Sequence, residues 1–258
     1  MKLALFSPYG LAHSEAGLLY LVANYLLKSG ADVTQLRCDG AFAVCGRDVK
    51  VEEGRNVMSC ARCIGEQRAL AHWASCKSKE ISSFLVADDV LQSAKWLSWV
   101  STADLFRSEF RGVNLWNVCG EEFTSRYPES SITELSTREE ECLRQLYIAY
   151  VHATVASERF IAGTAPSLHF VAGRLDPVSR AYLTQAQASN GDVAIFFYDT
   201  MEEAIIVESV RTGARYATKL LLNGITSMRN DPRTWAPEVT AIVHEILTFL
   251  GFAPDRVS

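Results

Sequence analysis

The sequence predicts an α/β fold with a Rossmann-like, mostly parallel sheet and helices on both of its faces. Short apolar runs alternate with amphipathic segments of helical length along the first 200 residues. The first 40 residues show this alternation as strand, helix and strand, which is the start of a βαβ unit. After residue 200 two apolar runs flank a turn that contains glycine, so we expect an added β-hairpin before a last helix.

The N-terminal unit shows the pattern most clearly. Residues 3–6 form an apolar run that ends at Ser-Pro-Tyr-Gly, as expected for a buried strand followed by a turn. Apolar residues at helical spacing predict a helix over residues 14–29, with Glu15 in its first turn and Gly30 as its terminator. Residues 31–36 alternate like a second strand.

The same signals predict the later elements and the domain organisation. Two segments, 38–63 and 112–135, lack a clear apolar period and are expected to be loops. Residues 1–200 are therefore expected to form one Rossmann-like domain with a cysteine-rich loop inserted at 38–63, and residues 201–258 a hairpin and helix packed on the same core. The expected helices cover 64–76, 87–100, 137–161, 177–188 and 237–249, and the expected later strands cover 167–172, 193–198, 204–209 and 216–222.

Length and composition narrow the class of protein. The chain has 258 residues, 48% of them hydrophobic, and a formal net charge of −5, so it can build a large core and lacks the basic character of a nucleic-acid-binding domain. The apolar run at the N-terminus is too short for a signal peptide, and no stretch approaches the length of a membrane-spanning helix. We therefore expect a cytoplasmic protein without a membrane span or a nucleic-acid partner, in which the seven cysteines are reduced.

Four of these cysteines carry the strongest chemical signal in the sequence. Cys38, Cys45, Cys60 and Cys63 fall within 26 residues, and the last two form a Cys-x2-Cys pair that lets two thiolates share one ion. Four thiolates complete a tetrahedral shell, so the simplest hypothesis is a Zn²⁺ site that ties the loop to the end of a strand. A [4Fe-4S] cluster uses the same ligands, and free thiols without metal are the third alternative.

The other three cysteines are less informative. Cys142 is expected to be a small core residue of a helix. Cys76 is either a helical residue or a reserve ligand, and Cys119 is either an ordinary loop thiol or a thiol that approaches the site.

A second set of candidate residues follows the strands. The turn after the first strand contains Tyr9, Gly10 and His13 and leads to Ser14, the expected helix cap. The free backbone N–H groups of a helix start favour an anion, so this turn is a candidate ligand site, with His13 as a possible general base. The ends of two later strands add Arg174 and Asp199, which a parallel sheet brings to the same edge.

These segments also carry a resemblance to a known family. The run Lys2-Leu3-Ala4-Leu5-Phe6-Ser7-Pro8-Tyr9-Gly10, the helix start Ser14-Glu15-Ala16-Gly17 and the segment Val171-Ala172-Gly173-Arg174-Leu175-Asp176 resemble the N-terminal domains of two-Rossmann (GT-B-like) bacterial glycosyltransferases. Arg37-Cys38-Asp39-Gly40 resembles the end of the second strand in cysteine-bearing relatives linked to surface polysaccharide biosynthesis. The resemblance covers about residues 1–200.

Two hypotheses for the function follow. The resemblance implies a glycosyltransferase-like protein that retains an acceptor-side domain and binds a small-molecule or glycan ligand. Those transferases bind the nucleotide sugar mainly in a second Rossmann domain, for which the chain has no room after residue 200. The chain is therefore expected to be active only with a partner protein that supplies the donor domain, or not to be active at all. The alternative, from a different class, is a non-catalytic iron–sulfur protein that senses or carries electrons on a Rossmann-like scaffold.

Overall fold

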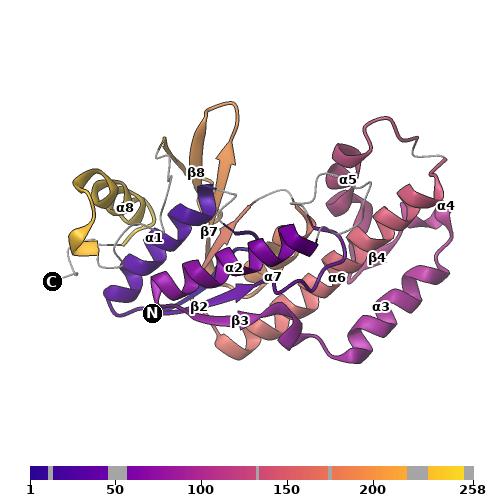
Figure 1. Ribbon diagram of the computed structural model, residues 1–258, viewed down its shortest axis with the longest axis horizontal. Coiled ribbons are helices and arrows are strands. Elements are labelled where there is room, and N and C mark those ends of the chain that lie inside the picture. Colours follow the sequence, from indigo (N-terminus) through magenta and orange to yellow (C-terminus); the bar gives the residue numbers. More distant parts are fainter. Residues whose placement is uncertain (11–13, 46–56, 132–133, 174–175, 220–231, 253–258) are drawn as a thin grey trace.

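The core of the molecule is a seven-stranded, mostly parallel sheet with helices on both faces, which confirms the predicted fold class (Figure 1). The computed structural model describes residues 1–10, 14–45, 57–131, 134–173, 176–219 and 232–252. The strand order is β3-β2-β1-β6-β7-β8-β9; the first five run parallel, and β8 and β9 are antiparallel additions. The strands are β1 (Lys2–Phe6), β2 (Asp32–Arg37), β3 (Lys77–Glu80), β6 (Leu168–Ala172), β7 (Asp192–Asp199), β8 (Ala204–Ser209) and β9 (Arg215–Thr218).

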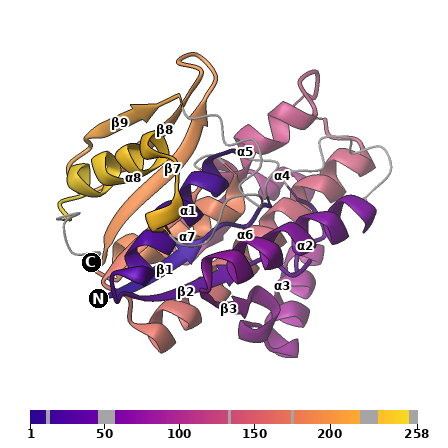
Figure 2. The same cartoon turned by 60° about the vertical axis from the view of Figure 1, so that its left-hand side comes forward.

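Two layers of helices cover this sheet (Figure 2). On one face α1 (Ser14–Lys28), part of α2 (Val57–Ala74) and α8 (Pro237–Phe249) pack on apolar residues of β1, β6 and β8. On the other face α6 (Thr137–Thr164) and α7 (Pro177–Ala188) pack on Ala4, Phe6 and Leu36. The C-terminal hairpin and helix thus share their core with the first strands.

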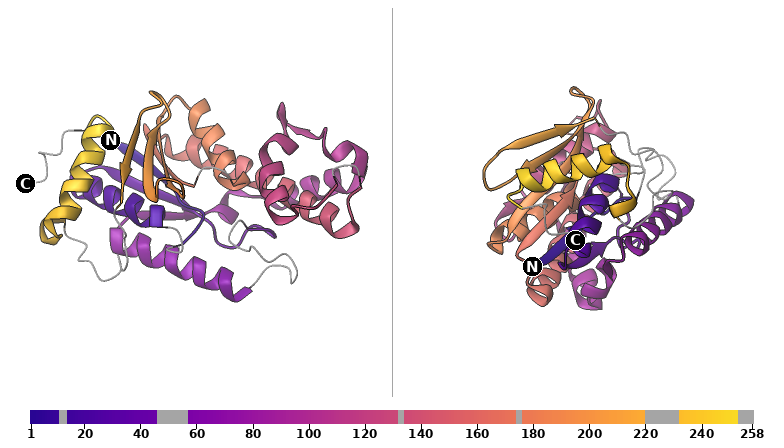
Figure 3. Two further views of the ribbon diagram at one scale, coloured as in Figure 1. Left: turned by 90° about the horizontal axis from the view of Figure 1, so that it is seen from above. Right: turned by 90° about the vertical axis from the view of Figure 1, so that its left-hand side faces the viewer.

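A helical insertion lies between β3 and β6 and extends away from the sheet, at the end opposite α8 (Figure 3). It packs against α6 through α3 and α5. Its elements are the 3-10 helix η2 (Ile81–Phe84), α3 (Ala87–Trp99), α4 (Thr102–Leu105), the two-stranded sheet of β4 (Glu109–Phe110) and β5 (Val113–Asn114), and α5 (Leu115–Arg126). A further 3-10 helix, η4 (Pro232–Thr234), precedes α8.

Local signals explain where the long helices begin. At the start of α6, Ser136 accepts a hydrogen bond from the Glu139 backbone while the Glu139 carboxylate accepts one from the Ser136 backbone, a capping box. At the start of α7, the Asp176 side chain accepts from Ser179 N, and Pro177 fits the first helical turn. No helix among the described residues is both long and apolar enough to cross a membrane.

Two expectations about local structure were wrong, and one strand was missed. Helix α2 begins at Val57, so Cys60 and Cys63 lie on a helix and not in a loop; its buried face includes Cys63, Gln67 and Leu70 at helical spacing. Helix α5 occupies part of the segment expected to be a loop. Strand β3 was not predicted, because its residues lack any apolar pattern.

Candidate metal centre

The four cysteines of the predicted metal site line one pocket at the carboxyl edge of the sheet. Cys38 and Cys45 follow β2, while Cys60 and Cys63 lie in the first two turns of α2. The turn after β1 contributes Pro8 to the same pocket. The cavity measures about 20 Å³, and about 10–15 Å³ is enough to hold one water-sized sphere. Three separate segments of the chain thus meet around one small cavity.

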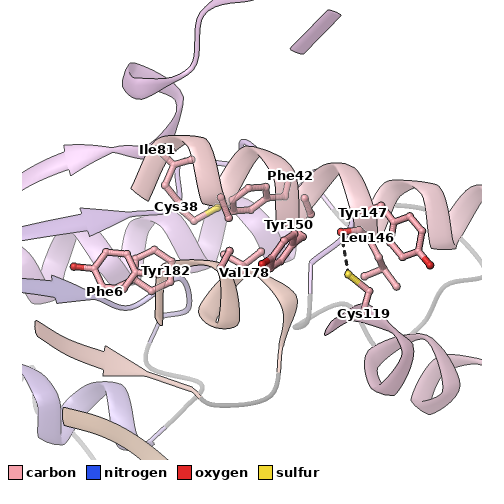
Figure 4. Packing of buried hydrophobic residues seen from close by; sticks show 14 of the residues in the cluster. Phe6, Cys38, Phe42, Ile81, Cys119, Leu146, Tyr147, Tyr150, Val178 and Tyr182 are labelled. Carbon is pink, nitrogen blue, oxygen red and sulfur yellow. Dashed lines mark hydrogen bonds between the residues drawn. The ribbon is translucent and has the colours of Figure 1, made fainter. Parts of the chain in front are cut away.

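The cysteines differ in burial. Cys38 is 9% exposed and Cys63 is 6% exposed, while Cys45 and Cys60 are half-buried. Cys38 also belongs to the apolar cluster between the sheet and α6, where it lies beside Phe42 (Figure 4). The pocket therefore has a buried side against the core and a more open side.

Backbone N–H groups point at the two buried sulfur atoms. Gly10 N donates a hydrogen bond to Cys63 Sγ at 3.2 Å, and Gly40 N donates to Cys38 Sγ at 3.3 Å. Such N–H groups stabilise negative charge on sulfur and are a common second layer around metal-bound thiolates. These contacts would stabilise the two sulfur atoms as thiolates once a metal ion is bound.

Gly10 is the point of closest approach between the β1 turn and α2. A Cβ atom at this position would lie 2.5 Å from Glu66 Oε2 and 3.0 Å from the Cys63 carbonyl oxygen. Only glycine lets the backbone come near enough for the N–H···S contact. The residue predicted as part of a ligand site is therefore a packing requirement of the cysteine pocket.

The helical insertion contacts the Cys45 backbone through Arg126 of α5. The guanidinium donates to the Cys45 carbonyl oxygen at 2.7 Å and pairs with Glu122 one turn earlier at 2.5 Å. The Arg126 side chain is only 5% exposed, so this contact is shielded from water. The segment that carries Cys45 is thus anchored to the insertion as well as to β2.

The four cysteine side chains are not arranged as the coordination shell of a metal ion. Among the described residues no three His, Cys, Asp or Glu side chains form a group that could hold a metal ion. All seven cysteines are free, and burial raises the pKa of the Cys38 thiol to about 11, although the N–H groups of Gly40 and Ala41 oppose this effect. Metal binding would therefore have to displace the Cys38 proton and draw the side chains together.

The second predicted set of residues is only partly brought together. Tyr9 is buried, and the pKa of its hydroxyl is raised well above 10 by burial first and then by the neighbouring Asp176 carboxylate. Ser14 is the first residue of α1. Asp199 accepts hydrogen bonds from Met201 N at 2.8 Å and Glu202 N at 3.2 Å, so it shapes the turn between β7 and β8 and does not line the cysteine pocket. His13 and Arg174 lie outside the described residues.

The remaining cysteines lie away from the pocket. Cys119 and Cys142 are buried in the cluster around α6, where Cys119 Sγ contacts the Leu146 carbonyl oxygen at 3.7 Å (Figure 4). Cys76 follows α2, and burial raises the pKa of its thiol to about 12. The core role expected for Cys142 agrees with its burial, and Cys119 lies on a helix and not in a loop.

Two residues of the site were not anticipated from the sequence. Gln67 lines the pocket because it lies four residues after Cys63 on the same face of α2, a spacing that a correct helix start would have exposed. Arg126 reaches Cys45 across 81 positions of sequence, and no local pattern signals such a contact.

Comparisons with known proteins add no family to this description. The sequence matches no protein-family model, and no curated protein matches it significantly. The fold and the pocket therefore define the chain only as a Rossmann-like α/β protein with a cysteine-lined edge.

Proposed function

We propose that this chain is a metal-binding protein in which Cys38, Cys45, Cys60 and Cys63 bind one Zn²⁺ ion at the carboxyl edge of the sheet. The observation that carries this proposal is that all four cysteines line a single pocket. The N–H groups of Gly10 and Gly40, which point at two of the sulfur atoms, support it further.

A site of this kind has a structural role. Four thiolates leave no open coordination position for water or substrate, so the ion would tie the β1 turn, the segment after β2 and the start of α2 together. Because metal binding energy at such a site is folding energy, the zinc-loaded chain is more stable than the metal-free chain. At free zinc a thousandfold above Kd the expected gain is about 4 kcal/mol.

The alternative of a [4Fe-4S] cluster would use the same four thiolates, and metal analysis distinguishes it from zinc. The cytoplasmic location, with reduced cysteines, stays a prediction from the sequence. The glycosyltransferase-like role in surface carbohydrate biosynthesis, with a glycan ligand and a donor-domain partner, stays a prediction from the resemblance alone.

The experiment is metal analysis of the protein purified without oxygen, together with its visible spectrum. We expect one zinc per chain and no colour. Cys60→Ser should lose the zinc and the stability that zinc confers, while the matched control Cys142→Ser, in the core away from the pocket, should keep the zinc. Brown absorption with iron and sulfide would show that the site binds an iron–sulfur cluster and not zinc. Seven titratable thiols with no metal would refute the metal site.

A further inference from the structure

The side chain of Gln67 is a buried amide inside the cysteine pocket. It is 0% exposed and lies one helical turn after Cys63 on α2. Its Nε2 donates to the Pro8 carbonyl oxygen at 3.3 Å and to Cys63 Sγ at 3.5 Å. Its Oε1 is buried and has no hydrogen-bond partner among the described residues.

The Pro8 carbonyl fixes the orientation of this amide. If the amide were flipped, Oε1 would face the Pro8 carbonyl oxygen, and two acceptors would meet without a proton between them. The N–H side of Gln67 therefore points toward Pro8 and Cys63. The amide therefore gives the buried Pro8 carbonyl oxygen a donor, while its own Oε1 has no partner among the described residues. A leucine at this position would remove the donor to the Pro8 carbonyl.

Cys63 Sγ consequently accepts from two N–H groups on different elements. Gly10 N approaches from the β1 turn at 3.2 Å, and Gln67 Nε2 approaches from α2 at 3.5 Å. Both donors would support this sulfur atom as a metal-bound thiolate. Gln67 also links the Pro8 carbonyl to the same sulfur, so it fixes the β1 turn relative to the metal ligand.

We propose that Gln67 is a positioning residue of the metal centre, which orients the Cys63 thiolate and reduces its electron donation to the bound ion. This inference rests on the proposed function. It assigns a role to a residue that is neither a ligand nor a part of the cysteine motif, and it explains why a polar side chain occupies a fully buried position.

The test uses Co²⁺ as a probe of the thiolate site in the full-length protein. Gln67→Leu should weaken Co²⁺ binding about 10- to 100-fold, the usual effect of losing such a supporting contact. The sulfur-to-cobalt charge-transfer band should move to longer wavelength, because a sulfur that has lost a hydrogen bond donates its electrons more readily. A purely structural role would not shift this band.

The matched control is Asn24→Leu. Asn24 on α1 is also a fully buried amide with an unpaired oxygen, but its Nδ2 donates to the Ala74 carbonyl oxygen and not to a cysteine. Its replacement should leave both the Co²⁺ affinity and the band unchanged. Gln67→Met, which keeps the length of the side chain without a donor, serves as a second variant should Gln67→Leu not fold.

The outcomes separate the two proposals. An unchanged band and affinity in both Gln67 variants would overturn the role of Gln67 and leave the metal site intact. A wild-type protein that shows no thiolate-to-cobalt absorption would overturn the metal site and this inference with it. A band shift in Asn24→Leu as large as in Gln67→Leu would show that any buried amide has the same effect, and would also overturn the inference.

Discussion

Acidification should destabilise this protein through His169, whose side chain is buried between β6 and α7. His169 on β6 is 0% exposed, and its ring nitrogens face the hydroxyl groups of Tyr182 at 3.0 Å and Ser189 at 3.2 Å. Burial lowers the pKa of His169 from 6.5 to about 4. The imidazole is therefore neutral in the folded chain at pH 7, and acid must charge it at a site where no carboxylate of the described residues pairs with it.

The magnitude follows from this pKa shift. The unfolded chain takes up the proton near pH 6.5 and the folded chain only near pH 4, so stability falls as the pH falls through this window and the loss is complete below it. One pKa unit corresponds to about 1.4 kcal/mol, which gives a loss of about 2 kcal/mol at pH 5 and about 3.4 kcal/mol below pH 4.

Urea unfolding at pH 7.5, 6 and 5 measures this loss, with chelator and reductant present so that metal binding does not contribute. His169→Gln should reduce the fall in unfolding free energy between pH 7.5 and 5 by about 2 kcal/mol relative to the wild type. An NMR titration of the five histidines measures the pKa itself. A native His169 that becomes charged above pH 6 would refute the reasoning.

Three further predictions test other contacts. Gly10→Ala should destabilise the chain by about 1–3 kcal/mol, because the added Cβ overpacks against α2. Gly65→Ala should be neutral or stabilising, because nothing lies within 4 Å of the added Cβ. Thermal unfolding compares the two variants. Arg126→Met should speed the alkylation of Cys45, because it removes the 2.7 Å contact to the Cys45 carbonyl oxygen. Mass spectrometry measures the alkylation rate, and an unchanged rate would show that the contact does not hold this segment. Gly191→Ala would place a Cβ 2.5 Å from the ring of the buried histidine, so it should lower the melting temperature and raise that histidine's pKa by letting water reach the ring; a wild-type titration curve would contradict this.

The sequence could predict the elements that bury apolar faces, but it missed elements held by other contacts. Strand β3 is polar throughout and is a strand because its backbone pairs with β2, with Thr34 opposite Lys77. Helix α5 was expected to be a loop because its segment lacks a clear apolar period, and it contains Gly120. In the fold a Cβ there would lie 2.9 Å from the Trp116 ring, so this glycine serves helix packing and does not break the helix.

The candidate site, too, could be predicted from the sequence only in part. The spacing of four cysteines was enough to predict that they belong together, and they line one pocket. The supporting contacts could not be predicted, because Gly10 meets α2 through backbone atoms and Arg126 arrives from a distant helix. The spacing of a motif indicates candidate metal ligands, whereas the hydrogen-bond donors around those ligands depend on tertiary structure.

Strand β3 also affects how separate molecules meet. It forms one edge of the sheet, is four residues long, and exposes Lys77 and Lys79 to solvent. A strand of another molecule that tried to extend the sheet here would find few backbone groups and would bring ammonium groups close together. This edge of the sheet is therefore protected against edge-to-edge aggregation. The polar residues that made β3 hard to predict from the sequence also discourage another strand from pairing with it.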